Sequence, residues 1–407
     1  MNAQDANDYI GREDRCGAHN YHPLPVVLER GEGVYVWDVE GRKYFDFLAA
    51  YSAVNQGHCH PKIVEALTRQ AQKLALTSRA FYNNVLGEWE EYMTSLFGYD
   101  KILPMNSGAE ADETALKLTR KWAYKVKGIP PNQAKIIVCN GNFHGRTITI
   151  ISMSSDPDAY NDYGPYTPGF INIPYNDTDA LEQYLKDPHV AGFLVEPIQA
   201  EAGVYVPEDG YLKKAAGLCK KHQVLFIADE VQTGLARTGK MLACDYENVR
   251  PDILILGKAI SGGMYPVSCV LADDEIMLTV KPGEHGSTYG GNPLAAKVSM
   301  AAMEVIREEK LAENATIMGD LFRKSMRDIK SEMIEIVRGK GLLNAIAIKP
   351  THGKSAWDVC LAMKEHGILA KPTHEHIIRF TPPLIITEKQ MTEAISRIKQ
   401  TFNELGF

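Results

Sequence analysis

The sequence predicts an α/β protein. Its main unit is a mostly parallel central sheet with helices on both faces, joined to a smaller α+β unit. In the middle of the chain, short apolar segments without polar alternation are interleaved with helical segments, which is typical of a parallel sheet buried on both faces. The two ends of the chain lack this alternation. The length of 407 residues exceeds that of one ordinary core, so more than one domain is expected.

The middle of the chain supplies the elements of the predicted sheet. Apolar residues at helical spacing predict three helices, over residues 111–128, 178–190 and 210–223. Short apolar runs bounded by Gly, Pro or charged residues predict five strands, over residues 134–141, 191–198, 224–230, 252–258 and 267–273. Ligands of such sheets gather at the carboxyl ends of the strands, so the residues that follow these strands are the first site candidates.

The two ends of the chain predict the smaller unit. Residues 33–47 alternate between apolar and polar and contain an Asp-Val-Glu-Gly turn, which predicts a β-hairpin. From about residue 310 a charged helical run leads to candidate strands at 335–348 and 376–384, and then to an amphipathic helix from Thr387. We therefore expect residues 1–60 to contribute to the small domain, 61–309 to form the large domain, and 310–407 to form the C-terminal small domain.

Composition excludes several classes of protein. The net charge is −7 without a dense basic run, and no apolar stretch is long enough to span a bilayer, so neither nucleic acid nor membrane is expected as a partner. The seven scattered cysteines suit reduced thiols inside a cell. The "HCH" run at 58–60 lacks a metal-site spacing, so no metal is predicted. The start of the chain lacks signal features, which predicts a cytoplasmic protein, or a mitochondrial matrix protein if a presequence was removed.

Three polar residues follow predicted strands: Glu196, Asp229 and Lys258. A lysine at the mouth of a buried strand is costly to desolvate, and one use for such an amine is a Schiff base with an aldehyde. A carboxylate such as Asp229 can hold a pyridinium nitrogen protonated, and pyridoxal phosphate needs both groups. The alternatives are a lysine that reaches the surface and an aspartate that caps a turn.

A phosphate-binding segment is predicted at residues 106–117, "NSGAEADETALK". Ser107 is a candidate N-cap, Gly108 permits close approach, and free N–H groups at a helix start bind anions. Glu110 completes a capping-box pattern, which is the plainer interpretation and is compatible with an anion site. A Gly-rich loop adds the hydroxyls of Ser287 and Thr288, or is an ordinary turn.

The segment "NFHGRT" offers two further candidates. Phe143 suits stacking on a flat ring, with core packing as its alternative, and Arg146 suits a carboxylate.

Taken together, these segments resemble the class III, or omega, aminotransferases that use pyridoxal 5′-phosphate. The resemblance runs through nearly the whole chain and rests on an ordered series: "NSGAEA", "FHGRT", "EPIQAEAG", "ADEVQTGLARTG", "LGKAISGG" and "STYGGNP". Within the class, "HNYHPLPVVLERGEGVYVWD" and "KPGEHGSTYGGNPLA" resemble the members that act on ornithine. The resemblance implies fold type I of the pyridoxal-phosphate-dependent transferases and a homodimer with shared active sites.

The resemblance also assigns cofactor contacts. Lys258 is expected to be the Schiff-base lysine and proton shuttle, and Asp229 to pair with the ring nitrogen; these two are the catalytic residues. Thr288 is expected to reach the phosphate of the neighbouring subunit, and Gln232 to lie near the ring hydroxyl. The full set of expected cofactor-binding residues is Gly108, Ala109, Phe143, Asp229, Gln232, Lys258, Ser287 and Thr288.

The expected substrate pocket contains Tyr21, Tyr51, Arg146, Glu201 and Arg379, with Glu196 and His144 in support. His144 stands where other members of the class carry histidine or tryptophan, so that position does not discriminate between them.

The implied reaction is transfer of the δ-amino group of L-ornithine to 2-oxoglutarate by a ping-pong mechanism, which gives glutamate 5-semialdehyde and glutamate. The reacting carbon lies far from the carboxylate in ornithine and next to one in 2-oxoglutarate, so two arginines are needed. The resemblance gives Arg146 the far role and Arg379 the near role. Glu201 is expected to neutralise Arg379 while ornithine is bound, because an unpaired buried cation is costly.

Three other functions compete with this one. The nearest is another omega-aminotransferase, acting on acetylornithine or 4-aminobutyrate. A nucleotide-dependent dehydrogenase is disfavoured because no GxGxxG follows a strand. A non-catalytic binding protein would be expected to lack the lysine or the aspartate, and both are present.

Overall fold

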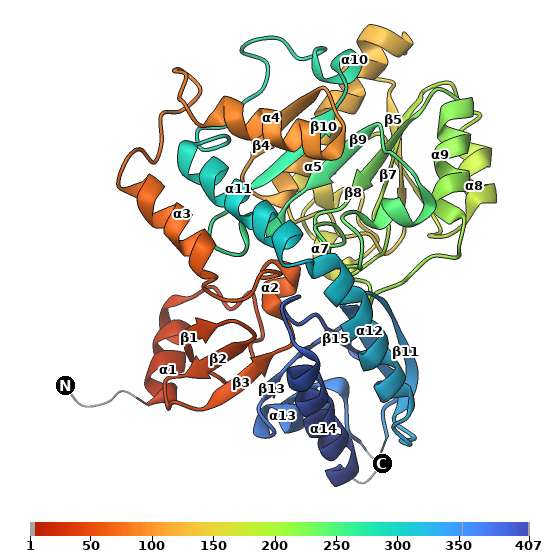
Figure 1. Ribbon diagram of the computed structural model, residues 1–407. Helices are drawn as coiled ribbons and strands as arrows, with labels where there is room; N and C mark the ends of the chain where they lie inside the picture. The colour runs from red at the N-terminus through yellow and green to blue at the C-terminus, as the bar shows by residue number, and fades with distance from the viewer. Residues whose placement is uncertain (1–4, 352, 406–407) are drawn as a thin grey trace.

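The computed structural model describes residues 5–351 and 353–405. Within them a seven-stranded sheet forms the centre of the larger part of the molecule (Figure 1), in the order β4-β10-β9-β8-β7-β5-β6. All its strands run parallel except β10, which is antiparallel to both neighbours. The strands are β4 (Lys101–Met105), β5 (Lys135–Cys139), β6 (Phe170–Ile173), β7 (Val190–Val195), β8 (Leu225–Asp229), β9 (Ile253–Leu256) and β10 (Ser268–Ala272).

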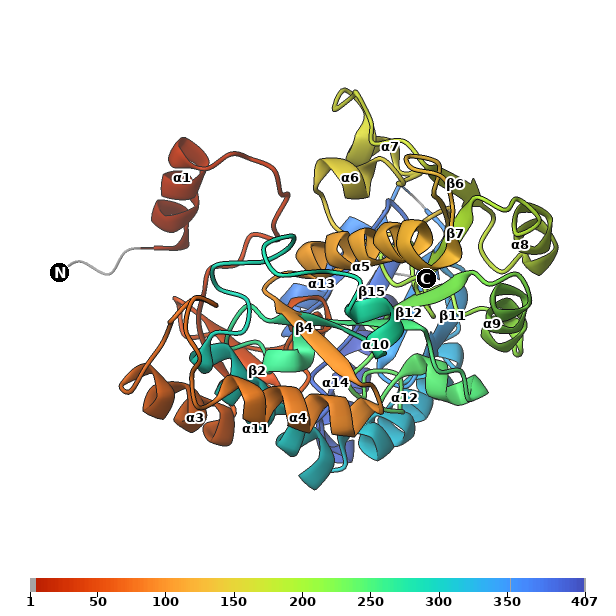
Figure 2. The same cartoon turned by 90° about the horizontal axis from the view of Figure 1, so that it is seen from above.

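Helices cover both faces of this sheet, because the strands are apolar on both sides. Ile253 and Ile255 of β9 pack in the core beneath α5, whereas Leu254 and Leu256 face the opposite layer. Figure 2 shows α5 lying across one face of the sheet. That face carries α5 (Gly108–Trp122) and α10 (Asp274–Met277), and the other carries α3 (Pro61–Ala71), α4 (Leu86–Phe97), α8 (Thr178–Tyr184), α9 (Tyr211–Lys221) and α11 (Pro293–Glu308).

The N-terminal hairpin joins the C-terminal part of the chain in one sheet, of order β1-β2-β3-β13. Strand β3 pairs in parallel with β13, so segments more than 300 residues apart lie side by side, as Figure 1 shows. Helix α1 stands apart from the rest of the chain (Figure 2) and has no buried residue. The elements are α1 (Ala6–Cys16), β1 (Leu28–Glu32), β2 (Tyr35–Asp38), β3 (Lys43–Asp46), α2 (Ala49–Ser52) and β13 (Ile368–Leu369).

The C-terminal part forms a second four-stranded sheet of order β11-β12-β15-β14, with pairs that are all antiparallel. Its strands are β11 (Ile334–Lys340), β12 (Leu343–Ile348), β14 (Lys371–Thr373) and β15 (Ile377–Phe380). Its helices are α12 (Leu311–Arg327), α13 (Ala356–Glu365) and α14 (Glu388–Glu404). Thr387 is the N-cap of α14 and accepts a hydrogen bond from the backbone N–H of Gln390, where the sequence predicted the helix to begin.

The predicted mostly parallel sheet and the hairpin are confirmed, but some elements differ. The predicted helix at 178–190 ends at Tyr184, because Pro188 cannot continue it. The predicted helix at 111–128 changes to a π-helical turn over Ala123–Lys127. Strands β4 and β6 were not predicted: β4 contains a proline, and β6 carries the polar Asn172. The division of the chain at residues 60 and 309 stays a prediction.

Two findings bear on the composition arguments. All seven cysteines are free, and only Cys16 and Cys59 are exposed. Each helix in the described ranges is too short or too polar to cross a bilayer.

Candidate active site

The carboxyl ends of β7, β8 and β9 bring Glu196, Asp229 and Lys258 to one edge of the central sheet. Asp229 is the last residue of β8, Glu196 follows β7, and Lys258 lies two residues beyond β9. A cavity of about 190 Å³ opens between them. Its lining contains eight of the predicted site residues: Gly108, Ala109, Phe143, His144, Glu196, Asp229, Gln232 and Lys258.

Lys258 is held in a strained backbone conformation. Its φ is +44°, which is rare for a residue with a side chain and costs on the order of 1–3 kcal/mol. It begins a short 3₁₀ turn that follows Gly257. Burial lowers the pKa of its ammonium, although the charges of Glu201 and Asp229 oppose that change. The side chain therefore has more free amine than an ordinary lysine at neutral pH.

Asp229 is buried and carries one hydrogen-bond donor on each carboxylate oxygen. The backbone N–H of Val231 donates to Oδ1 at 2.9 Å. His144 Nδ1 lies 2.7 Å from Oδ2. These two contacts fix the orientation of the carboxylate at the edge of the cavity.

The start of α5 reaches the cavity through Gly108 and Ala109. Ser107 forms the capping box: its Oγ accepts from the N–H of Glu110 at 3.2 Å, and its own N–H donates to Glu110 Oε2 at 2.8 Å. The plainer interpretation of this motif is therefore correct. It leaves the first N–H groups of the helix without a partner inside it, so an anion site remains compatible with the cap.

Gly145 explains how the loop after β5 approaches this helix start so closely. Its φ is +125°, and a Cβ on it would lie 2.6 Å from the Cβ of Ala109. Any side chain here would therefore push the loop away from the cavity.

A second cavity of about 360 Å³ shares Gly108 and Lys258 with the first. Asn106 borders it and donates from Nδ2 to Ser287 Oγ at 3.0 Å. The Gly-rich loop before α11 therefore lies against the start of α5 in the same chain. Thr288 belongs to the lining of neither cavity.

Glu201 and Arg379 form a partly buried ion pair beside the cavity, although they lie 178 positions apart in the sequence. Arg379 Nη1 donates to Glu201 Oε1 at 2.7 Å, and Gln232 Nε2 donates to the same oxygen at 3.2 Å. The predicted pairing of Glu201 with Arg379 is therefore present. Burial acts to raise the pKa of Glu201, but the positive charges of Arg379 and Lys258 outweigh it and lower the pKa.

Tyr51 contacts this pair from a backbone segment of unusual conformation. The Arg379 guanidinium lies 5.0 Å from the centre of the Tyr51 ring. Residues 49–52 all have φ between +46° and +72°, so α2 is one turn of left-handed helix. Each such residue costs roughly 1–2 kcal/mol relative to the right-handed conformation, so the local sequence does not favour this turn. Asp46 supports the turn by accepting from the N–H groups of Leu48 and Ala49 at 2.9 and 2.8 Å.

Glu196 supports the loop after β5. Its Oε1 accepts from the N–H of Phe143 at 2.9 Å. Burial raises the pKa of Glu196 to about 8. This side chain is therefore largely a neutral acid at neutral pH.

The remaining predicted residues lie outside the cavity lining. Arg146 is exposed, with its guanidinium 5.5 Å from the centre of the Phe143 ring. Tyr21 is 74% exposed. Their roles stay predictions, as do those of Ser287 and Thr288.

Four residues of the lining were not singled out from the sequence: Asp112, Gly145, Val231 and Thr233. Asp112 carried a signal that was available. It lies four residues after Gly108 on α5, hence on the same helix face, and its neighbour one turn on is the buried Ala115. An acidic residue on the apolar face of a helix is costly to bury, which indicates a specific role for it.

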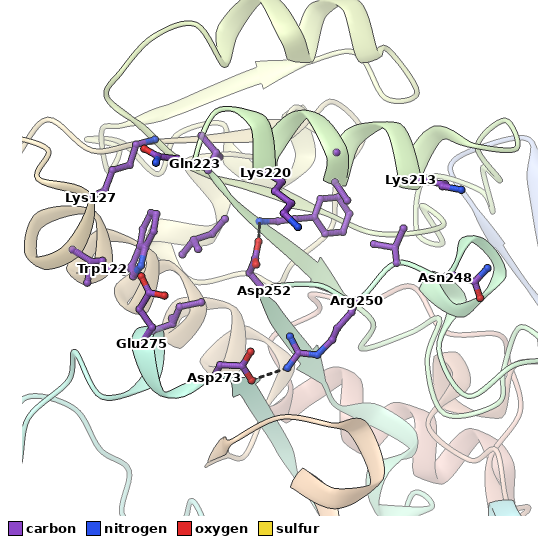
Figure 3. A pocket seen from close by; sticks show the side chains of 18 residues that line it. Trp122, Lys127, Lys213, Lys220, Gln223, Asn248, Arg250, Asp252, Asp273 and Glu275 are labelled. Carbon is purple, nitrogen blue, oxygen red and sulfur yellow. Dashed lines mark hydrogen bonds and ion pairs between the residues drawn. The ribbon is translucent and has the colours of Figure 1, made fainter.

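A larger cavity, of about 680 Å³, lies elsewhere (Figure 3). It is found at the start of β8, near Leu225 and Phe226, whereas the candidate site lies at the other end of that strand. Arg250 pairs with Asp273 across it at 2.6 Å. Its lining contains none of the predicted site residues, so size does not identify the site here.

The histidines of the "HCH" run bind separate acids. His58 Nε2 lies 2.7 Å from Asp46 Oδ2, and His60 Nε2 lies 2.8 Å from Glu309 Oε1.

Comparison with known proteins gives consistent results. The family model for class III aminotransferases matches residues 16–402. The mitochondrial ornithine aminotransferase of Drosophila melanogaster is 66% identical over 390 residues, which cover 96% of this chain and 90% of the relative. A structure of the ornithine aminotransferase from Toxoplasma gondii, in which PLP partly occupies the active site, superimposes with a TM-score of 0.98. It is 49% identical, and the match covers 99% of this chain and 95% of the Toxoplasma gondii chain.

One similar structure carries a different name. The acetylornithine aminotransferase of Elizabethkingia anophelis is 61% identical, with a TM-score of 0.91, and covers 98% of this chain and 100% of its own. Both names fall in one family, and the fold, the strand-end lysine and the matched length agree with it. The chain therefore belongs to the class III aminotransferases.

Proposed function

We propose that this protein transfers the δ-amino group of L-ornithine to 2-oxoglutarate, giving glutamate 5-semialdehyde and glutamate. The observation that carries the proposal is the partly buried pair of Glu201 and Arg379 beside Lys258. Ornithine has no carboxylate at its reacting carbon, so Glu201 neutralises Arg379 while ornithine is bound. The 2-oxoglutarate that follows does have a carboxylate there, which can then pair with Arg379. The name of the Drosophila relative supports the same substrate.

The cofactor is pyridoxal 5′-phosphate, which when bound supplies an electron sink for bond breaking at the amine-bearing carbon. The residues present fit it. Lys258 offers a partly free amine, Asp229 a buried carboxyl group with fixed orientation, and the start of α5 an anion-binding end. Phe143 would cover one face of the ring, and Gln232 would lie near the ring hydroxyl.

Lys258 acts as the base in this proposal. Its Nζ takes a proton from the amine-bearing carbon of the substrate and would later deliver that proton to the cofactor. A catalytic base works best when its pKa is near the operating pH, and burial moves the pKa of Lys258 in that direction. The strained φ of +44° fixes where its side chain begins, which limits the positions that Nζ can occupy.

Arg379 and Glu201 change partners between the two half-reactions. While ornithine is bound, Glu201 pairs with Arg379, because nothing on the substrate can neutralise that cation. When 2-oxoglutarate enters, its carboxylate next to the reacting carbon takes the place of Glu201. The backbone of Glu201 is anchored by Thr373, whose Oγ1 donates to its carbonyl at 2.8 Å, so the movement is limited to the side chain.

Arg146, Tyr21 and Tyr51 select the far end of the substrate in this proposal. Arg146 is exposed and accessible to a carboxylate. Tyr21 and Tyr51 would hold the α-amino and carboxylate end of ornithine, which leaves the δ-amine at the cofactor.

We further propose a homodimer in which Thr288 reaches the phosphate site of the other subunit. Thr288 lines no part of the cavity in its own chain. Several large side chains are also uncovered, including Tyr21 and Phe81, each 74% exposed. Helix α1, which has no buried residue, adds a further uncovered surface.

The compartment stays a prediction between cytoplasm and mitochondrial matrix. The name of the Drosophila relative supports the mitochondrial alternative.

Acetylornithine is the second candidate substrate, because the 61% identical structure from Elizabethkingia anophelis carries that name. A site for acetylornithine has to accept an acetyl group on the α-nitrogen. The arrangement of Tyr21 and Tyr51 proposed here instead contacts a free α-amine.

The test is the amine half-reaction, followed by the visible spectrum of the cofactor with ornithine, acetylornithine or 4-aminobutyrate. We expect the highest kcat/KM for ornithine. A higher kcat/KM for acetylornithine would assign the protein to the second function. Loss of reaction with all three amines in Lys258→Ala, together with retained cofactor, would support the role of the lysine.

A further inference from the structure

Three buried titratable groups meet at the inner wall of the cavity. Asp112 from α5, His144 from the loop after β5, and Asp229 from β8 offer side-chain atoms that all lie within 4.8 Å of one another. His144 Nδ1 is 2.7 Å from Asp229 Oδ2 and 3.8 Å from Asp112 Oδ1. The side chains of His144, Asp112 and Asp229 are 0%, 1% and 5% exposed.

The two carboxyl groups have unequal surroundings. Both oxygens of Asp229 accept hydrogen bonds, from the N–H of Val231 and from His144. Within the described residues, Asp112 Oδ1 is buried and has no hydrogen-bond partner. An ionised oxygen in that position would be desolvated without compensation, which is costly.

Two carboxylates this close do not both ionise easily in a buried site. Asp112 is the one whose buried Oδ1 has no donor within the described residues, so the proton is expected on Asp112. The other charged groups around Asp112 point the same way on balance. Burial raises the pKa of Asp112 well above its usual range, the charges of Asp229, Glu196 and Glu113 add to this, and the charge of Lys258 opposes it.

We propose that Asp112 is a positioning residue that carries a proton at neutral pH, so that it adds no second negative charge beside Asp229. A protonated Asp112 packs against His144 but does not compete with Asp229 for the N–H donor of the histidine. His144 then donates from Nδ1 to Asp229 alone. The pairing of Asp229 with the ring nitrogen of the cofactor rests on the proposed function. The protonation of Asp112 does not rest on it.

Infrared spectroscopy of the purified holoenzyme tests the protonation directly. A protonated carboxylic acid has a C=O stretch that is separate from the bands of carboxylates and amides. We expect such a band at pH 7, lost in Asp112→Asn and retained in Glu113→Gln. Glu113 is the matched control, because it adjoins Asp112 on α5, is partly exposed and accepts from Thr147 Oγ1 at 2.7 Å. Further acid bands are expected from Glu196 and Glu230, because burial raises their pKa values to about 8 and about 7. They are identified by Glu196→Gln and Glu230→Gln.

The same measurement works without a variant. On alkaline titration of the wild-type protein, the Asp112 band should persist above neutral pH and then disappear. Identical acid bands in the wild type and in folded Asp112→Asn would overturn the proposal. If the variant does not fold, absence of any acid band beyond those of Glu196 and Glu230 in the wild type at pH 7 would do the same.

A second readout follows His144 by NMR of histidine-labelled protein, with the signal assigned through His144→Gln. Replacing a neutral acid by a neutral amide should change the pKa of His144 by less than about half a unit. Removing an ionised group at this separation would lower it by roughly 2–3 units. Such a drop in Asp112→Asn would overturn the proposal. Neither measurement depends on turnover, so failure of the proposed substrate leaves this inference intact.

Discussion

Replacing Glu201 with alanine tests how the site distinguishes two amines. In the present arrangement Glu201 Oε1 accepts from Arg379 Nη1 at 2.7 Å, with side-chain exposures of 22% and 3%. Without Glu201, Arg379 is a buried cation with no acid beside it. It should then attract the α-carboxylate of an amino acid and bring the α-amine, rather than the δ-amine, to the reacting position. Activity toward glutamate should rise relative to ornithine.

The size of the change follows from the kind of contact that is lost. A charge-assisted, partly buried hydrogen bond contributes about 1.5–3 kcal/mol. The ratio of the two amine half-reactions should therefore shift toward glutamate by roughly one to two powers of ten. The variant Glu201→Gln keeps the shape and an acceptor oxygen but removes the charge, so an intermediate shift is expected from it.

The assay is single-turnover absorption spectroscopy of the cofactor with ornithine and with glutamate at several concentrations. Each variant is compared with the wild type as the ratio of the two values of kcat/KM. If that ratio stays within twofold of the wild-type value in Glu201→Ala, Glu201 has no part in the selection. The preference for the δ-amine would then come from Tyr21 and Tyr51.

Three further predictions concern other parts of the site. Asp229→Asn should leave the fold intact and lower turnover by orders of magnitude, because a neutral amide cannot hold the ring nitrogen protonated; near-native turnover with bound cofactor would contradict this role. Thr288→Ala should weaken cofactor retention, and in mixed dimers with Lys258→Ala the defect should appear at the partner's lysine site; a defect confined to the mutated subunit would refute the shared site. The pKa of Glu196 is raised to about 8 in the folded protein, so its stabilising contribution is complete below about pH 4.5 and is lost as the pH rises to about 8. Denaturant unfolding of Glu196→Gln should therefore show a flatter dependence of the free energy of unfolding on pH across that range.

Local sequence was sufficient for the framework of the site. Uninterrupted apolar runs predicted β7, β8 and β9, because a strand buried on both faces has no polar positions. The polar residues Glu196, Asp229 and Lys258 then had to lie at one edge, since parallel strands end on the same side of a sheet. Ser107 and Glu110 predicted the start of α5, because a capping box is made within four residues. The same reasoning failed for β4, whose proline and lysine hide an edge strand.

Tertiary structure decided which side chains meet. The contact of Glu201 with Arg379 joins a loop of the large part of the molecule to β15 of the small one, and it was expected from a family resemblance rather than from local pattern. The left-handed turn that places Tyr51 runs against the preference of every residue in it, so only the surrounding contacts hold it. The protonation of Asp112 depends on donors that reach Asp229 and do not reach Asp112. Backbone propensity and hydrophobic period act over a few residues, and so they specify elements. Charge pairing and burial act between residues that are distant in sequence, and so only the folded chain determines them.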